Sequence, residues 1–313
     1  MKRIWSFLLL AFGFTWAIAG IGAALGVDTT KQLPYMAMAA LCMFGPAFAA
    51  VVQVRLLDKA PWSALGLHPR AIHWPGIIRT VVLGMSIVPL CLLVIWLFGD
   101  QLGIARFGHV AVTGERFGTA VKEMLEQMGG KTPSSSTEFL TRLPGGVVLV
   151  VILVSALFMA FTFNLPFMLG EELGWRGYLY RATAHWSGGK RIVFTGFFWG
   201  LWHAPLIMLG HNYPGYPLLG IPMMIVFCLL LALLFDWSRT RVRSVWGPCI
   251  LHGLINGSAG AFVLFAWDGN VLFGSPVGVG GFVAIGLLGF ALIAFDGGYR
   301  RSLTEAGGSA EEG

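Results

Sequence analysis

The sequence predicts an all-α protein that lies in a membrane as a bundle of about eight transmembrane helices. Three observations lead to this fold class. Hydrophobic residues make up 56% of the 313 residues and charged residues only 12%, and the mean hydropathy is +0.75. An average soluble domain is about 25% charged, so this composition excludes a soluble protein. The apolar residues are also gathered into runs near the length of about 20 residues that a helix needs to cross a bilayer.

Eight apolar runs are the predicted spans of one membrane domain that covers residues 1–313. They are residues 4–25, 35–56, 77–98, 146–169, 192–209, 217–235, 245–267 and 277–295. The first run follows Lys2 and Arg3, as the apolar core of a signal peptide does. Its length of about 22 residues exceeds the 7 to 15 residues of that core, so we expect a retained signal anchor.

Lysine and arginine predict the orientation of the bundle. Most of the 21 basic residues fall in the segments that share a side with the N-terminus. The positive-inside rule places this side in the cytoplasm, so both termini are expected to be cytoplasmic, in the plasma membrane of a bacterium or archaeon. The net charge of +6 does not indicate a nucleic acid partner, because the basic residues lie in short loops between apolar runs.

Residues 99–145 are the one sizeable polar insertion, and we expect them on the non-cytoplasmic side. One face of an amphipathic helix in this loop carries four apolar residues: Phe117, Val121, Leu125 and Met128. We expect this helix to lie on the outer membrane surface rather than to form a lid over a substrate. Residues 129–136 predict a flexible connector, and the small and acidic residues 302–313 predict a disordered tail.

Two adjacent carboxylates, Glu171 and Glu172, follow the fourth run directly. If the helix continues, Glu172 and Arg176 lie four positions apart on one face and can pair, while Glu171 points about 100° away. This spacing gives Glu172 a structural role and leaves Glu171 free for chemistry. The alternative is a charged helix cap at the membrane surface.

Two later runs carry polar residues well inside their apolar sequence. His203 lies in the fifth run, and His252 and Asn256 lie one helical turn apart in the seventh, so that both can face the same cavity. Any one of them could be a packed residue, but the whole set on three spans is hard to explain by packing. Straight helices would leave Glu171 nearer the surface than the others. We therefore expect the acidic segment to be a continuing or re-entrant helix buried in protein.

Small residues accompany both histidines. Gly196 and Gly200 are four apart in the fifth run, and Gly253 and Gly257 are four apart in the seventh. Such pairs allow membrane helices to approach closely, so we expect both histidine-bearing helices to pack tightly.

The remaining polar residues have structural interpretations. Asn164 and Pro166 predict a kink in the fourth run just before the acidic pair. His185 and His211 are expected in loops on opposite sides of the membrane, without a direct role. The isolated cysteines inside the runs indicate neither a disulfide framework nor a zinc finger, and we expect them to be small buried residues. They are Cys42, Cys91, Cys228 and Cys249.

Taken in order, these residues form three short motifs. The motifs are Glu-Glu-x-x-x-Arg at 171–176, an aromatic residue and a histidine at 199 and 203, and His-x-x-x-Asn at 252–256. The ordered set resembles the motifs of the CPBP family, which comprises CAAX prenyl endopeptidases, bacteriocin-processing enzymes and the related Abi proteins. The resemblance covers about residues 165–256, less than a third of the chain. It departs at Trp199, where the family usually has phenylalanine, and we interpret this aromatic residue as a packing position.

The resemblance implies an intramembrane endopeptidase with a catalytic set of four residues and two supporting residues. The catalytic set is Glu171, His203, His252 and Asn256, and the supporting residues are Glu172 and Arg176. On chemical grounds a partly desolvated glutamate can act as general base, and the other three can share its water, ligate a metal or donate to an oxyanion. Glu171, His203 and His252 would match a catalytic zinc site with an open fourth position. The His-Glu-x-x-His motif of soluble metalloproteases is absent, so Zn²⁺ is suggested rather than demonstrated.

Two other classes of function stay open. A catalytically silent membrane protein, giving bacteriocin immunity or acting as a scaffold, would use the polar residues only to tie helices together. An ion-coupled transporter would use them as an ion site, but the inverted repeats with paired broken helices typical of that class are not visible in the sequence. The expected partners are membrane lipid and a peptide or protein substrate, either prenylated or carrying a leader peptide, and no oligomeric state is implied.

Overall fold

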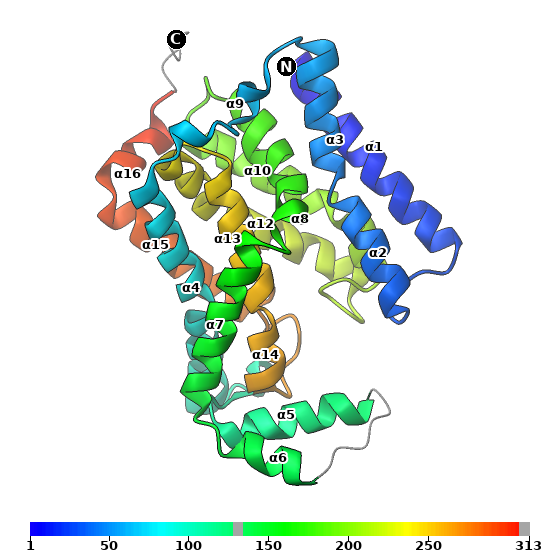
Figure 1. Cartoon of the computed structure of the whole chain (residues 1–313), viewed down its shortest axis with the longest axis vertical. Coiled ribbons are helices and arrows are strands. Elements are labelled where there is room, and N and C mark those ends of the chain that lie inside the picture. The colour runs from blue at the N-terminus through cyan, green and yellow to red at the C-terminus, as the bar shows by residue number, and fades with distance from the viewer. Residues whose placement is uncertain (128–133, 307–313) are drawn as a thin grey trace.

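The computed structural model describes residues 1–127 and 134–306. Over these residues the chain is mainly helical, which confirms the all-α fold class. The one sheet of the described residues pairs two short antiparallel strands, β1 (His109–Val110) and β2 (Ala266–Trp267). Figure 1 shows the long helices gathered in one bundle, with α5 and α6 projecting from its lower end.

Five helical stretches of the described residues are long and apolar enough to cross a membrane. They are Lys2–Ala24, Gln32–Leu57, Trp74–Gln101, Pro217–Val242 and Trp246–Phe265. The first is α1 and the fourth is α12. The second contains α2 (Gln32–Cys42), α3 (Gly45–Val52) and a π-helical turn, the third contains α4 (Trp74–Trp96) and a π-helical turn, and the fifth contains α13 (Trp246–Ser258) and α14 (Gly260–Phe265). Two bent helix pairs raise the number to as many as seven. They are α7 (Gly145–Phe161) with Leu165–Ala182, bent by 63°, and α15 (Val279–Phe295) with α16 (Gly297–Thr304), bent by 99°.

The predicted number of about eight spans is not confirmed. The fifth predicted run, residues 192–209, is divided between α10 (Gly188–Trp202) and α11 (Ala204–Met208). The division follows from Pro205, because proline has no backbone N–H for the carbonyl of Leu201 and its ring clashes with that carbonyl. With 15 residues, α10 is shorter than a bilayer crossing requires.

The predicted kink before the acidic pair is present between α7 and the next helix, α8 (Leu165–Glu172). Pro166 lies in the first turn of α8, where its missing N–H costs no helical hydrogen bond. The side-chain amide of Asn164 donates to the carbonyl oxygen of Gly253 at 3.2 Å. The bend is therefore tied to α13, and the acidic segment after it is buried in protein, as expected for either a continuing or a re-entrant helix.

The glycine pairs bring helix backbones together as predicted. A Cβ atom on Gly200 would lie 2.5 Å from the Cα atom of Ile225 in α12, and one on Gly253 would lie 2.8 Å from the Cα atom of Ala160 in α7. Real Cβ atoms do not approach so closely. The helix that ends at His203 and the helix that carries His252 are thus both held at backbone contact with a neighbour.

The predicted amphipathic helix of residues 99–145 is α5 (Gly114–Gln127), which packs against α14 and against α6 (Ser134–Thr141). On its predicted apolar face Phe117 and Val121 are partly buried, Leu125 is exposed and Met128 lies outside the described residues. The position of this helix on a membrane surface stays a prediction.

Two predicted irregular segments are partly helical. The connector of residues 129–136 lies partly outside the described residues, but residues 134–136 begin α6. Residues 302–304 of the predicted disordered tail form the end of α16, while residues 307–313 lie outside the described residues. Both corrections have the same cause, since a polar composition does not prevent a short helix when a neighbouring helix covers it.

Basic segments from different parts of the chain meet at one end of the bundle, at the top of Figure 1. The guanidinium group of Arg3 lies 3.2 Å from the carboxylate of Asp58. Both residues line a surface cleft with Arg181, near the short helix α9 (Leu179–Ala182). These segments share a side, as the distribution of lysine and arginine predicts, and the assignment of that side to the cytoplasm stays a prediction.

Candidate active site

The acidic pair lies where α8 passes into a π-helical turn, Leu173–Tyr178. Such turns are frequent at functional sites. As predicted, Glu172 and Arg176 pair: Nη1 of Arg176 donates to Oε1 and Oε2 of Glu172 at 3.2 and 3.1 Å. The side chain of Glu172 is fully buried and that of Arg176 is 3% exposed. A buried carboxylate and a buried guanidinium are tolerated only as partners, so this pair belongs to the structure of the site.

Glu172 has a second partner that the sequence did not predict. Its Oε1 atom lies 2.9 Å from Nδ1 of His252, on α13. Because a carboxylate accepts hydrogen bonds and cannot donate them, Nδ1 must carry a proton. In the neutral imidazole this leaves Nε2 as the free, basic nitrogen. Glu172 therefore sets both the orientation and the tautomer of His252.

His203 lies at the break between α10 and α11, and the break creates its hydrogen bond. The backbone N–H of His203 donates to the carbonyl of Gly200 at 3.2 Å, in place of the α-helical acceptor Trp199. The carbonyl of Trp199 is thereby available to the imidazole, whose Nδ1 lies 2.7 Å away. A carbonyl only accepts, so His203 also carries its proton on Nδ1 and has Nε2 free when neutral.

Glu171 points away from the Glu172 pair, as its position on the helix predicts. Its side chain is buried, and Oε2 accepts a hydrogen bond from the indole N–H of Trp199 at 2.9 Å. The interpretation of Trp199 as a packing position is therefore incomplete. The signal in the sequence was the tryptophan itself, because a buried indole N–H usually finds a partner and phenylalanine has none.

One cavity of about 480 Å³ brings the four predicted catalytic residues together. Glu171, His203 and His252 are almost fully buried, whereas Asn256 is exposed. The amide nitrogen of Asn256 lies 3.7 Å from the sulfur atom of Met168, which is a weak acceptor, so its N–H groups remain available to a ligand. Glu172 and Arg176 do not line the cavity.

The rest of the cavity wall is mostly apolar. It includes Ile87, Val88, Phe227, Leu231, Ile255 and Phe262. His211 also lines it, although the sequence predicted a loop residue without a role, while His185 is exposed in a turn as predicted. His211 was missed because the loop after α11 folds back over the site, and sequence spacing does not predict such a return.

The predicted zinc ligands do not form a metal-binding group. Within residues 1–127 and 134–306, no three His, Cys, Asp or Glu side chains lie close enough to hold a metal ion. Glu171, His203 and His252 share a cavity without converging on one point. The four cysteines are buried and free, as predicted.

The fold and this cavity define a class of protein: a helical integral membrane protein with an acid, two imidazoles and an amide around one cavity. Residues 146–258 match the family model of the type II CAAX prenyl endopeptidase Rce1-like proteins. The matched segment contains all three motifs, so over this part the chain is similar to the CAAX proteases that its motifs resemble.

A curated relative, CAAX prenyl protease 2 from Methanococcus maripaludis, is 46% identical over 44 residues. This alignment covers 14% of the chain and 16% of the relative. The chain therefore spans less than a fifth of the length of this relative in the alignment.

Proposed function

We propose that the chain is an intramembrane endopeptidase that hydrolyses a peptide bond next to an apolar group of a membrane-associated substrate. One observation carries the proposal: Glu171, His203, His252 and Asn256 come from three separate helical segments and line one cavity. A scaffold would need these groups only to tie helices together, with no polar atom left free in a cavity. Two of the contacts do join helices, but Glu171 and the two imidazoles each keep an oxygen or an Nε2 atom that a ligand can use.

In the proposed reaction Glu171 is the general base. It takes a proton from a water molecule as the water oxygen bonds to the scissile carbonyl carbon, and Nε2 of His203 accepts the other hydrogen and orients the water. The side-chain amide of Asn256 donates to the oxyanion that forms, a type of contact worth about 3 to 4 kcal/mol.

Collapse of this intermediate breaks the C–N bond. The proton taken by Glu171 passes through Nε2 of His252 to the departing amine, so that a carboxylic acid and an amine leave. Glu172 suits His252 to this role, because a carboxylate on Nδ1 stabilises the imidazolium form. No step is assigned to a metal ion, because the residues do not form a metal-binding group.

The apolar wall of the cavity supports the choice of substrate. It offers an aliphatic and aromatic surface beside the polar groups, which fits a lipid chain or an apolar peptide segment near the scissile bond. We therefore propose a prenylated protein terminus or an apolar leader peptide as the substrate, by similarity to the activity in the name of the relative.

The test is turnover of quenched fluorogenic peptides, with and without a prenyl group, by the purified protein in proteoliposomes. Glu171→Gln keeps the shape of the side chain and removes the base, so we expect a loss of about 100-fold or more in kcat. His185→Ala, at an exposed turn, is the matched control and should keep the wild-type rate. Equal turnover by wild-type protein and Glu171→Gln at equal abundance would reject the assignment of the base.

A further inference from the structure

We propose that Trp199 is the positioning residue of Glu171: its indole N–H fixes the carboxylate so that one oxygen is held and the other is presented to water. This inference rests on the proposed function, because it concerns the base of that reaction. The CPBP family usually has phenylalanine at the position of Trp199. Phenylalanine has no N–H group, so the usual family residue could not hold Glu171 in this way.

The contact itself is specific. Indole has one donor and no acceptor, so the bond at 2.9 Å selects Oε2 of Glu171 and leaves Oε1 as the proton acceptor. In the described part of the chain no other side chain donates a hydrogen bond to Glu171. Without this donor no side-chain hydrogen bond from the described residues would orient the buried carboxylate. Hydrogen bonds to a charged acceptor are about twice as strong as neutral ones, so a single donor is enough to select one rotamer.

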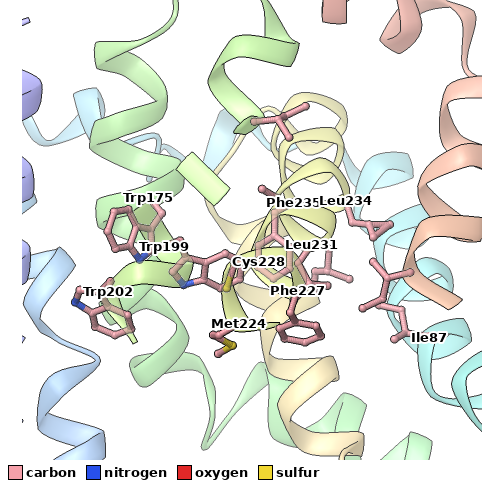
Figure 2. Close-up of a cluster of buried hydrophobic side chains, with 14 of the residues drawn as sticks. Ile87, Trp175, Trp199, Trp202, Met224, Phe227, Cys228, Leu231, Leu234 and Phe235 are labelled. Atoms are coloured by element: carbon pink, nitrogen blue, oxygen red, sulfur yellow. The ribbon is translucent and has the colours of Figure 1, made fainter. Parts of the chain in front are cut away.

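Trp199 is itself held rigidly. It is 2% exposed, and the guanidinium of Arg176 lies 4.2 Å from the centre of its ring. Its ring also packs against Phe235 of α12 at 5.2 Å between centroids. Figure 2 shows Trp199 extending from α10 toward Cys228 and Phe235 of α12, in the buried layer that also contains Trp175.

The same residue also reaches the two histidines. Its backbone carbonyl accepts the Nδ1 proton of His203, and its ring lies 5.7 Å from that of His252, edge to face. One side chain and its carbonyl thus connect the base with both imidazoles. A rigid element that touches each reacting group is what precise positioning of a catalytic set requires.

The first experiment tests the contact without turnover. In protein labelled with ¹⁵N-tryptophan, the indole cross-peak of Trp199 is assigned as the one lost in Trp199→Phe. Glu171→Gln replaces the charged acceptor by a neutral one, so this cross-peak should move upfield, while the cross-peak of Trp175 should stay in place. A Trp199 cross-peak that does not respond to Glu171→Gln overturns the inference.

The second experiment removes only the N–H. Replacement of Trp199 by 3-benzothienylalanine exchanges the indole N–H for sulfur and keeps the shape of the ring, so a purely structural role would leave the kinetics unchanged. We expect kcat to fall about 10- to 100-fold, from the loss of a hydrogen bond to a charged group. KM should stay the same because the cavity wall keeps its shape.

The matched control is the same replacement at Trp175. Its side chain is 1% exposed, its indole nitrogen has no hydrogen-bond partner in the part of the chain that the structure describes, and it does not line the cavity. Its kcat should therefore stay within about twofold of wild type, since no hydrogen bond is lost. If the protein with the sulfur analogue at Trp199 cleaves the peptide at the wild-type rate, this inference alone is overturned. A wild-type protein that cleaves no peptide overturns the proposed function, and this inference falls with it.

Discussion

Replacement of Glu172 by glutamine should be the most destabilising single substitution in the polar part of the site. The carboxylate is fully buried and neutralises Arg176, which is 3% exposed and whose Nη2 atom has no hydrogen-bond partner among the described residues. Glu172→Gln therefore leaves a guanidinium charge buried and uncompensated, a change that costs about 3 to 5 kcal/mol. Solvent screening reduces this value little, because both side chains are almost fully buried.

The assay is the free energy of unfolding in mixed micelles, measured from tryptophan fluorescence during a denaturant titration. Glu126→Gln is the matched control, because Glu126 pairs with Lys122 at 3.9 Å while both side chains are more than half exposed. An exposed pair of this kind is worth about 0 to 1 kcal/mol. A loss of less than about 1 kcal/mol for Glu172→Gln would refute the account of the buried pair.

A double substitution separates stability from activity. Adding Arg176→Met to Glu172→Gln removes the orphaned charge, and replacement of a buried ion pair by apolar groups is often neutral for stability. We expect most of the lost unfolding free energy to return. Turnover should stay low, because His252 still lacks the carboxylate that holds its Nδ1 proton. Recovery of both properties together would show that Glu172 serves only as a counter-charge.

Three further outcomes are expected. Gly200→Ala should lower the unfolding free energy by about 1 to 3 kcal/mol through overpacking. Gly286→Ala is the control and should leave the unfolding free energy unchanged, because a Cβ atom there meets nothing within 4 Å. Equal effects of the two substitutions would contradict the backbone contact at Gly200. Partial burial alone would raise the pKa of Asp296, but the Tyr299 N–H and the Arg241 side chain lower it. The difference in unfolding free energy between the wild type and Asp296→Asn should thus be complete above about pH 4 and should vanish as the pH falls below it. A difference that does not depend on pH would refute this. Chelators should leave peptide turnover unchanged, and metal analysis of the same sample should show no stoichiometric zinc; zinc lost together with activity would argue the opposite.

The sequence predicted best those features that depend on local geometry. The pairing of Glu172 with Arg176 follows from a spacing of four residues on one helix, and the common face of His252 and Asn256 follows from the same rule. The kink at Asn164 was also predictable, because the proline after it ends one helix and begins another. Such features need no knowledge of how helices are packed.

The remaining features depend on contacts between distant segments. Glu172 and His252 are 80 positions apart, and their hydrogen bond exists only because α13 packs beside α8. The break at His203 could have been predicted from the sequence, because Pro205 follows it closely and a proline interrupts a helix. The prediction of an unbroken fifth span did not take Pro205 into account. The indole of Trp199 could have been suspected as a donor, but its acceptor could be found only in the structure.

Two carboxylates that are neighbours in the chain reach different helices. Glu171 is bonded to Trp199 on α10 and Glu172 to His252 on α13, so this dipeptide clamps the two histidine-bearing helices at a set spacing. A bulky ligand that wedges α10 and α13 apart must break a charged hydrogen bond at one end of the clamp. Two hydrogen bonds therefore hold the spacing of these helices beside the cavity, and for the proposed reaction we expect this spacing to favour an extended peptide over a folded one.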